Sequence, residues 1–234
     1  DTASEDVIVR DGASPTTLNV VDGATISAVP EQDPALPDEG RAIGLFGGSI
    51  LNLTGGEAAG TLQVNDSATA NLSGGLIGED LEVNGGQINL SGTAAIDDDV
   101  FLNATATFNM NDGGEVGDQF FATGMSAVTL GETAGPINDD LFIRDEATLN
   151  MAGSELGDEL FVQGSGVATI TGGYIDDDLN ANDSGRIMVS FVEVDDSVDT
   201  SGVGFVQFDD GIVNGGFEAV EDSVINIAGG VFEN

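Results

Sequence analysis

The sequence contains no lysine, histidine, cysteine or tryptophan, and it has a single tyrosine. Without histidine and cysteine the chain cannot form a Ser-His-Asp triad, a thiolate nucleophile or an ordinary zinc site. The chain has four arginines and 42 acidic residues, which gives a net charge of −38. This charge excludes nucleic acid and anionic membrane surfaces as partners, because both are bound through Lys and Arg. No apolar run approaches the roughly 18 residues of a membrane-spanning helix, so we expect no membrane insertion.

Apolar residues nevertheless make up 40% of the chain. That fraction predicts a folded protein rather than a charged disordered tail. The chain begins with Asp1, which fits a mature product whose signal peptide has been removed. We therefore expect an extracellular or cell-surface location.

A repeat of 19 to 21 residues runs through the sequence. It is anchored on one apolar residue per repeat, most often just after acidic residues. Short apolar-x-apolar pairs, which indicate strands, follow the anchor and recur later in each unit. A branched or aromatic residue closes each unit. The anchors are Leu62, Leu81, Val100, Phe120, Leu141, Leu160, Leu179, Val198 and Phe217, extended backwards to Ile43 and Val7, and the closing residues are Ile77, Ile96, Val116, Ile137, Leu156, Ile175, Val194, Val213 and Phe232.

Repeats this short cannot bury their own apolar face and must stack on one another. The sequence therefore predicts an all-β parallel β-helix of ten to eleven coils of about 19 residues, forming a single domain over 1–234. The general handedness of parallel crossovers favours a right-handed helix. Residues 27–42, which include Pro30, Pro34 and Pro37, interrupt the repeat. We interpret them as a loop inserted after the first coil, either simply tolerated or covering a face of the solenoid.

An acidic column stands two residues before the anchors. Stacked carboxylates repel one another unless cations or salt offset the charge, and Ca²⁺ accepts carboxylate oxygens in flexible geometry. A row of calcium ions is one hypothesis, and a solvated acidic edge is the other. The candidate metal ligands are Glu79, Asp98, Asp118, Asp139, Asp158, Asp177 and Asp196.

Three stretches of this column, at 172–180, 74–82 and 113–121, resemble the calcium-binding nonapeptide of the repeats-in-toxin family. In all three stretches a branched apolar residue replaces the glycine at the fourth position of the family's motif: Ile175, Ile77 and Val116. The resemblance implies that Asp177 and Asp118 are calcium ligands. The repeat region as a whole is similar in general pattern to bacterial autotransporter passengers and surface adhesins.

Two further columns are expected to point outward. Between the inward residues of the first strand, four consecutive coils carry Phe101, Phe121, Phe142 and Phe161. Such an apolar stripe on a soluble protein favours an interface, unless a segment of the chain covers it. The second strand presents Thr and Asn outward, which indicates either a ladder of hydrogen-bonded amides or, by resemblance, the flat array of some ice-binding proteins.

Asn-x-Ser/Thr sequons are more frequent than chance predicts, partly because the repeat copies them. These glycosylation candidates are Asn52, Asn65, Asn71, Asn89, Asn103 and Asn182.

The repeat continues almost to Val231 and Phe232, with no amphipathic helix at either end. Open solenoid ends favour head-to-tail stacking of copies. We therefore expect a non-enzymatic structural protein that polymerises with itself into an extracellular filament or matrix, with Val231 and Phe232 at the axial interface. The alternatives are a monomeric adhesin or ice-binding module using the Thr/Asn face, and a polysaccharide hydrolase. The last requires two carboxylates in distinct environments, which no departure from the repeat provides.

Overall fold

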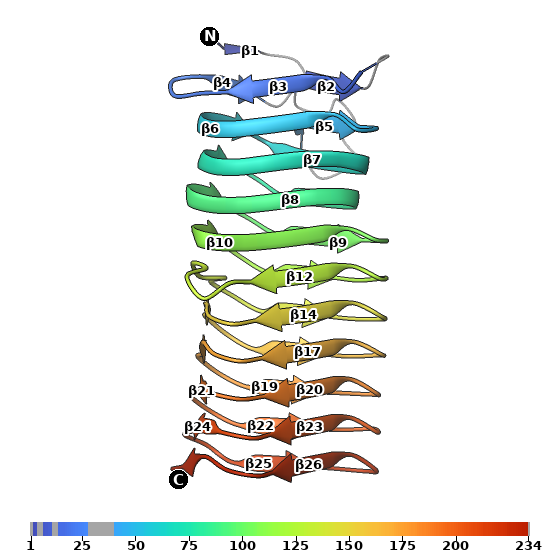
Figure 1. The fold of residues 1–234 in the computed structure, drawn as a ribbon, viewed down its shortest axis with the longest axis vertical. Helices are drawn as coiled ribbons and strands as arrows, with labels where there is room; N and C mark the ends of the chain where they lie inside the picture. Colours follow the sequence, from blue (N-terminus) through green and yellow to red (C-terminus); the bar gives the residue numbers. More distant parts are fainter. Residues whose placement is uncertain (1, 4–6, 11–13, 28–39, 234) are drawn as a thin grey trace.

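A computed structural model describes residues 2–3, 7–10, 14–27 and 40–233, and the predicted parallel β-solenoid is confirmed. About ten coils of about 19 residues stack into a straight column with the N-terminus at one end and the C-terminus at the other (Figure 1). The described residues contain no helix, so none that could span a membrane.

Each coil has three faces, and the strands pair in parallel with their counterparts in adjacent coils. The first face carries the anchor column, and the second and third faces follow it in the chain. Long strands bend around more than one face, namely β6 (Ile50–Ala59), β7 (Thr61–Ile77), β8 (Leu81–Ile96) and β10 (Thr107–Val116).

Shorter strands form single faces elsewhere. The first face has β2 (Val7–Arg10), β5 (Arg41–Phe46), β9 (Val100–Asn103), β11 (Phe120–Ala122), β13 (Leu141–Ile143), β16 (Leu160–Val162), β19 (Leu179–Ala181), β22 (Val198–Thr200) and β25 (Phe217–Ala219). The second has β3 (Thr17–Val20), β12 (Ala127–Leu130), β14 (Thr148–Met151), β17 (Val167–Ile170), β20 (Arg186–Val189), β23 (Phe205–Phe208) and β26 (Val224–Ile227). The third has β4 (Thr25–Ser27), β15 (Glu155–Leu156), β18 (Tyr174–Ile175), β21 (Val192–Val194), β24 (Gly211–Val213) and β27 (Val231–Phe232), and β1 (Thr2–Ala3) pairs with β4.

The register follows the sequence repeat. Val7 pairs with Ile43, Ile43 with Leu62, and the anchor column then continues without a slip to Val198 and Phe217. From Ile43 to Val198 every anchor is fully buried, as are the closing residues from Ile77 to Val213. Each fully buried Leu, Ile, Val or Phe contributes about 1.5–3 kcal/mol through the hydrophobic effect. One continuous core therefore holds the coils together.

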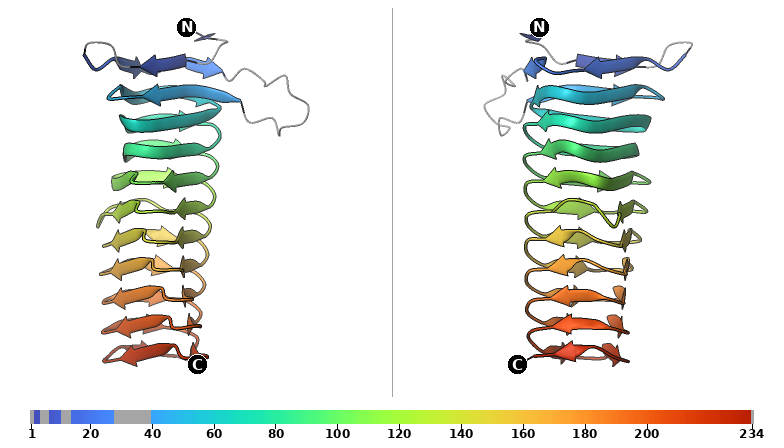
Figure 2. Two further views of the ribbon diagram at one scale, coloured as in Figure 1. Left: turned by 90° about the vertical axis from the view of Figure 1, so that its right-hand side faces the viewer. Right: turned by 60° about the vertical axis from the view of Figure 1, so that its left-hand side comes forward.

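The chain follows a right-handed path. In Figure 1 the second-face strands at the front run to the left, and the fainter strands behind run to the right as the chain descends. The two side views in Figure 2 show the same evenly spaced coils, so the cross-section is nearly constant along the column.

The turn between the first and second faces has a left-handed backbone in each described coil from Gly47 to Glu221. Glycine and an acidic residue alternate there for much of the column, as with Gly124 (φ 68°), Asp145 (φ 59°) and Gly164 (φ 63°). At the corner after the second face, Gly75 has φ +89°, and a Cβ there would lie 2.6 Å from the carbonyl oxygen of Gly56. No side chain fits that contact, which explains the glycine-rich corners.

The interruption is narrower at its ends than the sequence predicts. Ser27 is the last residue of β4, while Arg41 and Ala42 begin β5. These residues continue the ladder because β4 and β5 pair with β6 and β7. The remainder of the predicted loop, over 28–39, lies outside the described residues.

Candidate functional site

The acidic residues gather at the corner between the third face and the first. From Glu79 to Ser197 the chain crosses this corner just before each anchor. Five of these seven crossings carry two neighbouring carboxylates, and the other two carry one. We refer to the residues two before and one before the anchor as the outer and inner acidic columns. The outer column is Glu79, Asp98, Asp118, Asp139, Asp158, Asp177 and Asp196, and the acidic members of the inner column are Asp80, Asp99, Asp140, Glu159 and Asp178.

Carboxylates of the inner column bond the backbone of the next coil. Asp80 Oδ1 accepts from the N–H of Asp99 at 3.3 Å, and Asp99 Oδ1 accepts from the N–H of Gln119 at 3.0 Å. Asp178 Oδ1 accepts from both the N–H and the hydroxyl of Ser197, at 2.8 and 2.7 Å. These bonds fasten successive coils to one another. The inner column is therefore structural as well as charged.

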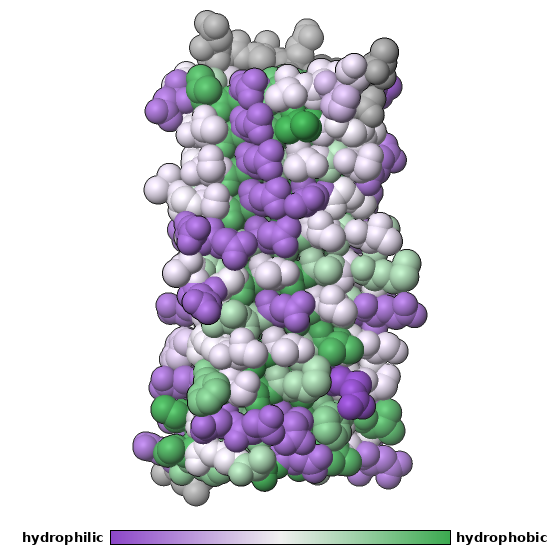
Figure 3. Space-filling view, in the orientation of Figure 1, coloured by the Kyte–Doolittle hydropathy of each residue, from purple (hydrophilic) through white to green (hydrophobic). Residues whose placement is uncertain are grey.

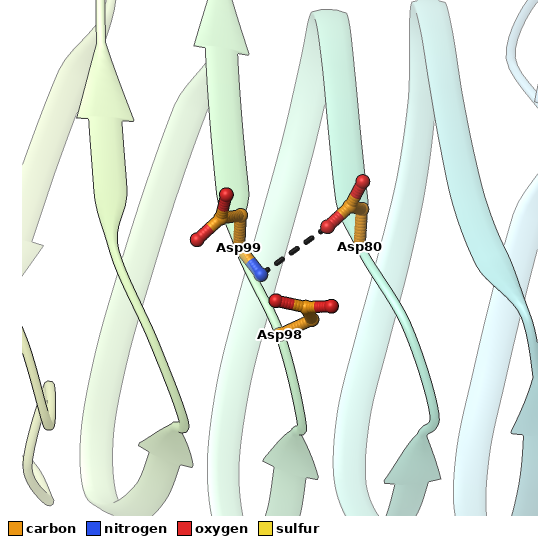
Figure 4. Close-up of side chains that lie close together, drawn as sticks. All are labelled: Asp80, Asp98 and Asp99. Atoms are coloured by element: carbon orange, nitrogen blue, oxygen red, sulfur yellow. Dashed lines mark hydrogen bonds between the residues drawn. The ribbon is translucent and has the colours of Figure 1, made fainter. Parts of the chain in front are cut away.

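Three clusters at this corner have carboxylate oxygens within 4.8 Å of one another, a spacing that fits a shared cation. Figure 4 shows the first, in which Asp80 and Asp99 project from neighbouring coils with Asp98 beside them. Each cluster combines an inner carboxylate with the outer carboxylate of the next coil. The clusters are Asp80, Asp98 and Asp99; Asp139, Asp140 and Asp158; and Asp177, Asp178 and Asp196.

Metal binding by the outer column stays a prediction. Five of its seven members fall in these clusters, and Glu79 and Asp118 do not. Four inner residues complete the clusters because the corner turns both columns toward the same space: Asp80, Asp99, Asp140 and Asp178. A cation could be held here, and nothing in the geometry identifies which one.

Burial and neighbouring carboxylates raise the pKa of several groups at this corner. Burial, followed by the charge of Asp178, raises the pKa of Glu159 to about 7. A hydrogen bond shared with the carboxyl of Asp139 raises the pKa of Asp118. Burial also raises the pKa of Asp140, although the hydrogen bond from the Glu159 N–H opposes that shift. A proton or a metal cation would relieve the same repulsion.

The predicted phenylalanine column is a stack of parallel rings. Phe101, Phe121, Phe142 and Phe161 are half-buried, and successive ring centroids lie 5.2, 4.8 and 4.9 Å apart with planes within 4° of parallel. Arg144 lies over Phe142 at 4.5 Å and donates from Nε to Gln163 Oε1. The rings thus present their edges outward. Their use as an interface stays a prediction.

The outward face of the second strands is an amide ladder, one of the two predicted alternatives. Asn52, Asn71 and Asn89 each donate from Nδ2 to the Asn Oδ1 of the preceding coil at 2.9 Å. The ladder begins at Asn19 and ends at Asn109. Figure 3 shows the resulting column of hydrophilic residues down the upper part of the face formed by β3, β6, β7, β8 and β10.

A second ladder was not expected from the sequence. Asn84 donates to Asn65 at 3.4 Å, and Asn103 donates to Asn84 at 3.2 Å, at the ends of the first-face strands. Its signal was present as an Asn repeated at one position of the coil. Five of the six sequon asparagines therefore donate from Nδ2 within the solenoid: Asn52, Asn65, Asn71, Asn89 and Asn103.

A shallow hollow of about 490 Å³ lies beside the first acidic cluster. It is lined by the cluster residues together with Glu82, Phe101 and the amides of Asn84 and Asn103. Its wall is thus almost entirely polar and negative. It joins the acidic corner to the beginning of the phenylalanine stack.

Comparison of the chain with known protein families, curated proteins and solved structures finds no match. The arrangement of its residues therefore carries the functional argument alone.

Proposed function

We propose that this chain is a structural protein, a rigid β-solenoid subunit that stacks end to end into an extracellular filament or matrix. The observation that carries the proposal is the C-terminal coil. Ile227 continues the column of Val189 and Phe208, which are buried, yet its own side chain is 47% exposed. Phe232 likewise continues the buried column of Val194 and Val213 and is 43% exposed, and Val231 beside it follows the outward position of Ile212.

The first and last coils that the structure describes also have strand edges without a neighbouring strand. Among the described strands, β25, β26 and β27 have a neighbour on one side only, as do β2 and β3 at the other end. Unpaired edges and apolar side chains both favour the addition of another coil. We propose that a second copy supplies it, with Val231 and Phe232 in the axial contact. Repetition of a contact that does not close generates a filament.

The proposed assembly also requires bound cations. Copies with a net charge of −38 repel one another, so assembly needs counterions at the acidic corner. We propose Ca²⁺ as the ion, because carboxylate oxygens in irregular geometry suit it better than they suit Mg²⁺. The three clusters would then each hold one ion between two coils.

No enzymatic activity is part of the proposal. The reason is that the acidic residues repeat in columns along a rod of nearly constant cross-section, which gives no described coil a distinct cleft for a substrate. The guanidinium groups of Arg144 and Arg186 lie over Phe142 and Phe205, at 4.5 and 4.6 Å from the ring centroids.

Electron microscopy of the purified chain, with and without a calcium chelator, tests the proposal. We expect filaments in calcium, and Ile227→Asp should give single rods because it places a charge on the end coil. Val203→Asp is the matched control, since Val203 is exposed on a lateral turn. Filaments that survive chelation would overturn the role of calcium alone. Single rods of the wild-type chain under all conditions would overturn the filament and favour a monomeric binding module on the Thr/Asn face.

A further inference from the structure

Phe191 is an exception among the residues of the solenoid corners. It stands between β20 and β21 with φ +64°, a left-handed backbone that bulky side chains rarely adopt. Its side chain is 69% exposed. In register, the neighbouring coils place Gly172 and Asp210 at this position. The chain therefore holds a large aromatic side chain in solvent, in a strained conformation, where the repeat does not require one.

A hollow opens beside this ring. Its volume is about 390 Å³, and Gly173 and Gly211 are among the residues that line it. The apolar walls are Phe191, Val192 and Ile212, with Val231 at the end nearest the C-terminus. Local strain that packing does not explain is typical of a functional position. The hollow has the size and lining to receive one apolar side chain.

The polar rim of the hollow is negative. The exposed carboxylates of Glu193 and Asp210 lie at its edge. A partner that enters it must bring positive charge, because buried or half-buried carboxylates without a counter-charge are unfavourable. A second copy carries the same net charge of −38 and lacks that complementarity. Charge thus distinguishes between the two possible occupants.

We propose that this hollow docks a segment of another protein in which an aromatic or large aliphatic side chain is flanked by lysine or arginine. The apolar side chain packs on Phe191 and Ile212, and the flanking cations pair with Glu193 and Asp210. Apart from Val231, which belongs to the last coil, the lining residues lie on the side of the rod, so a partner can contact them while copies stack through their ends. This inference does not depend on the proposed filament.

The absence of tryptophan from the chain gives the test a clean signal. The probe is a blocked peptide with one tryptophan between two pairs of lysines, and the comparison peptide has serine in place of tryptophan. We expect the tryptophan peptide to bind at least about tenfold more tightly, which corresponds to about one good apolar contact, with a blue shift of its fluorescence. A tryptophan peptide with neutral flanks should bind more weakly at low salt and show little dependence on salt.

Phe191→Gly should abolish the preference for tryptophan and leave Tm unchanged or raised, because glycine relieves the strained φ and little buried area is lost. Ile212→Ser, on the opposite wall, should weaken the preference as well. Met125→Ala is the control, since Met125 is 61% exposed on a distant turn. An unchanged preference in Phe191→Gly would overturn the proposal, and so would a large fall in Tm, which would show that Phe191 packs the fold. Self-association of the wild type that Phe191→Gly abolishes would overturn it in favour of a second copy.

Discussion

Asp140 Oδ1 accepts a hydrogen bond from the backbone N–H of Glu159 at 3.1 Å, one coil further along the chain. This contact ties two coils together, and it also brings a second carboxylate to the same half-buried corner. Cohesion and repulsion therefore act at the same residues. The stability of the rod should depend on whatever neutralises this corner, whether protons, salt or a bound cation.

Glu159 makes this dependence measurable through pH. Its pKa rises from 4.5 to about 7 in the folded chain. The folded state therefore binds the proton more tightly than the unfolded state, so the contribution of Glu159 to stability is full below pH 4.5 and is lost as the pH rises through about 7. We expect Glu159→Gln to remove part of the fall in the free energy of unfolding over this range, measured with urea at low ionic strength. Glu155→Gln in the same coil is the control because Glu155 is exposed on the third face, and an equal effect of the two substitutions would contradict the assignment.

If the clusters bind cations, one substitution should change Tm in opposite directions without and with Ca²⁺. Asp98→Asn removes a negative charge, so it should raise Tm slightly in the absence of divalent ions. It should also reduce the rise in Tm on adding Ca²⁺ by about 2–4 °C, the shift that about 1 kcal/mol produces in a chain of this size. Asp97→Asn changes the charge equally at an exposed residue outside the clusters. If calorimetry finds the same calcium response in both variants, the cluster of Asp80, Asp98 and Asp99 is not the binding site.

The amide ladder should be cooperative. Asn71→Ala leaves Asn52 Oδ1 without its donor and Asn89 Nδ2 without its acceptor. We expect a loss of about 1–2 kcal/mol in the free energy of unfolding, the usual cost of polar groups left unpaired in a partly buried place. Asn150→Ala, at an exposed position on the same face, should change stability by less than about 0.5 kcal/mol. Equal losses in the two variants would mean that the ladder contributes nothing beyond each side chain alone.

The phenylalanine stack should depend on its interior rings. Phe142 stacks with Phe121 and Phe161, whereas Phe161 stacks with one ring only. Phe142→Ala is expected to cost about 2 kcal/mol and Phe161→Ala about half of that, by the usual value of one aromatic pair. A double-mutant cycle with Arg144→Ala should show coupling to Phe142, since the guanidinium lies over that ring. Additive effects in the cycle would exclude the cation–π contact.

Glycosylation, if the host can perform it, should favour one sequon. Among the six candidates, Asn182 is the one for which no hydrogen bond from Nδ2 occurs within the described residues, and it stands at a turn rather than in a ladder. The other five belong to columns whose next amide lies one coil away, which leaves little room for a glycan. Mass spectrometry of the chain secreted from a glycosylating host should find Asn182 modified most. Asn182→Gln should remove most of the mass increase, and full occupancy of Asn71 instead would contradict this reasoning.

The period of the sequence determined most of the fold. Apolar residues at fixed positions of a 19-residue unit can share one core only if the coils stack in register, so the anchor column from Ile43 to Val198 could be read directly from the chain. The first amide ladder followed from the same logic, because an outward Asn repeated in a parallel stack meets its own counterpart. Alternation in a strand also places Phe101 to Phe161 outward without further information.

Contacts across the corners could be decided only by the tertiary structure. Asp98 and Asp99 are adjacent in the sequence, yet only the path of the chain at the corner determines which carboxylate bonds the next coil and which completes a cluster. The left-handed backbone of Phe191 and the hollow beside it likewise appear only in the tertiary structure. A periodic sequence fixes which residues stack, because stacking needs only register, whereas the directions of side chains at a bend depend on backbone angles that the repeat does not encode.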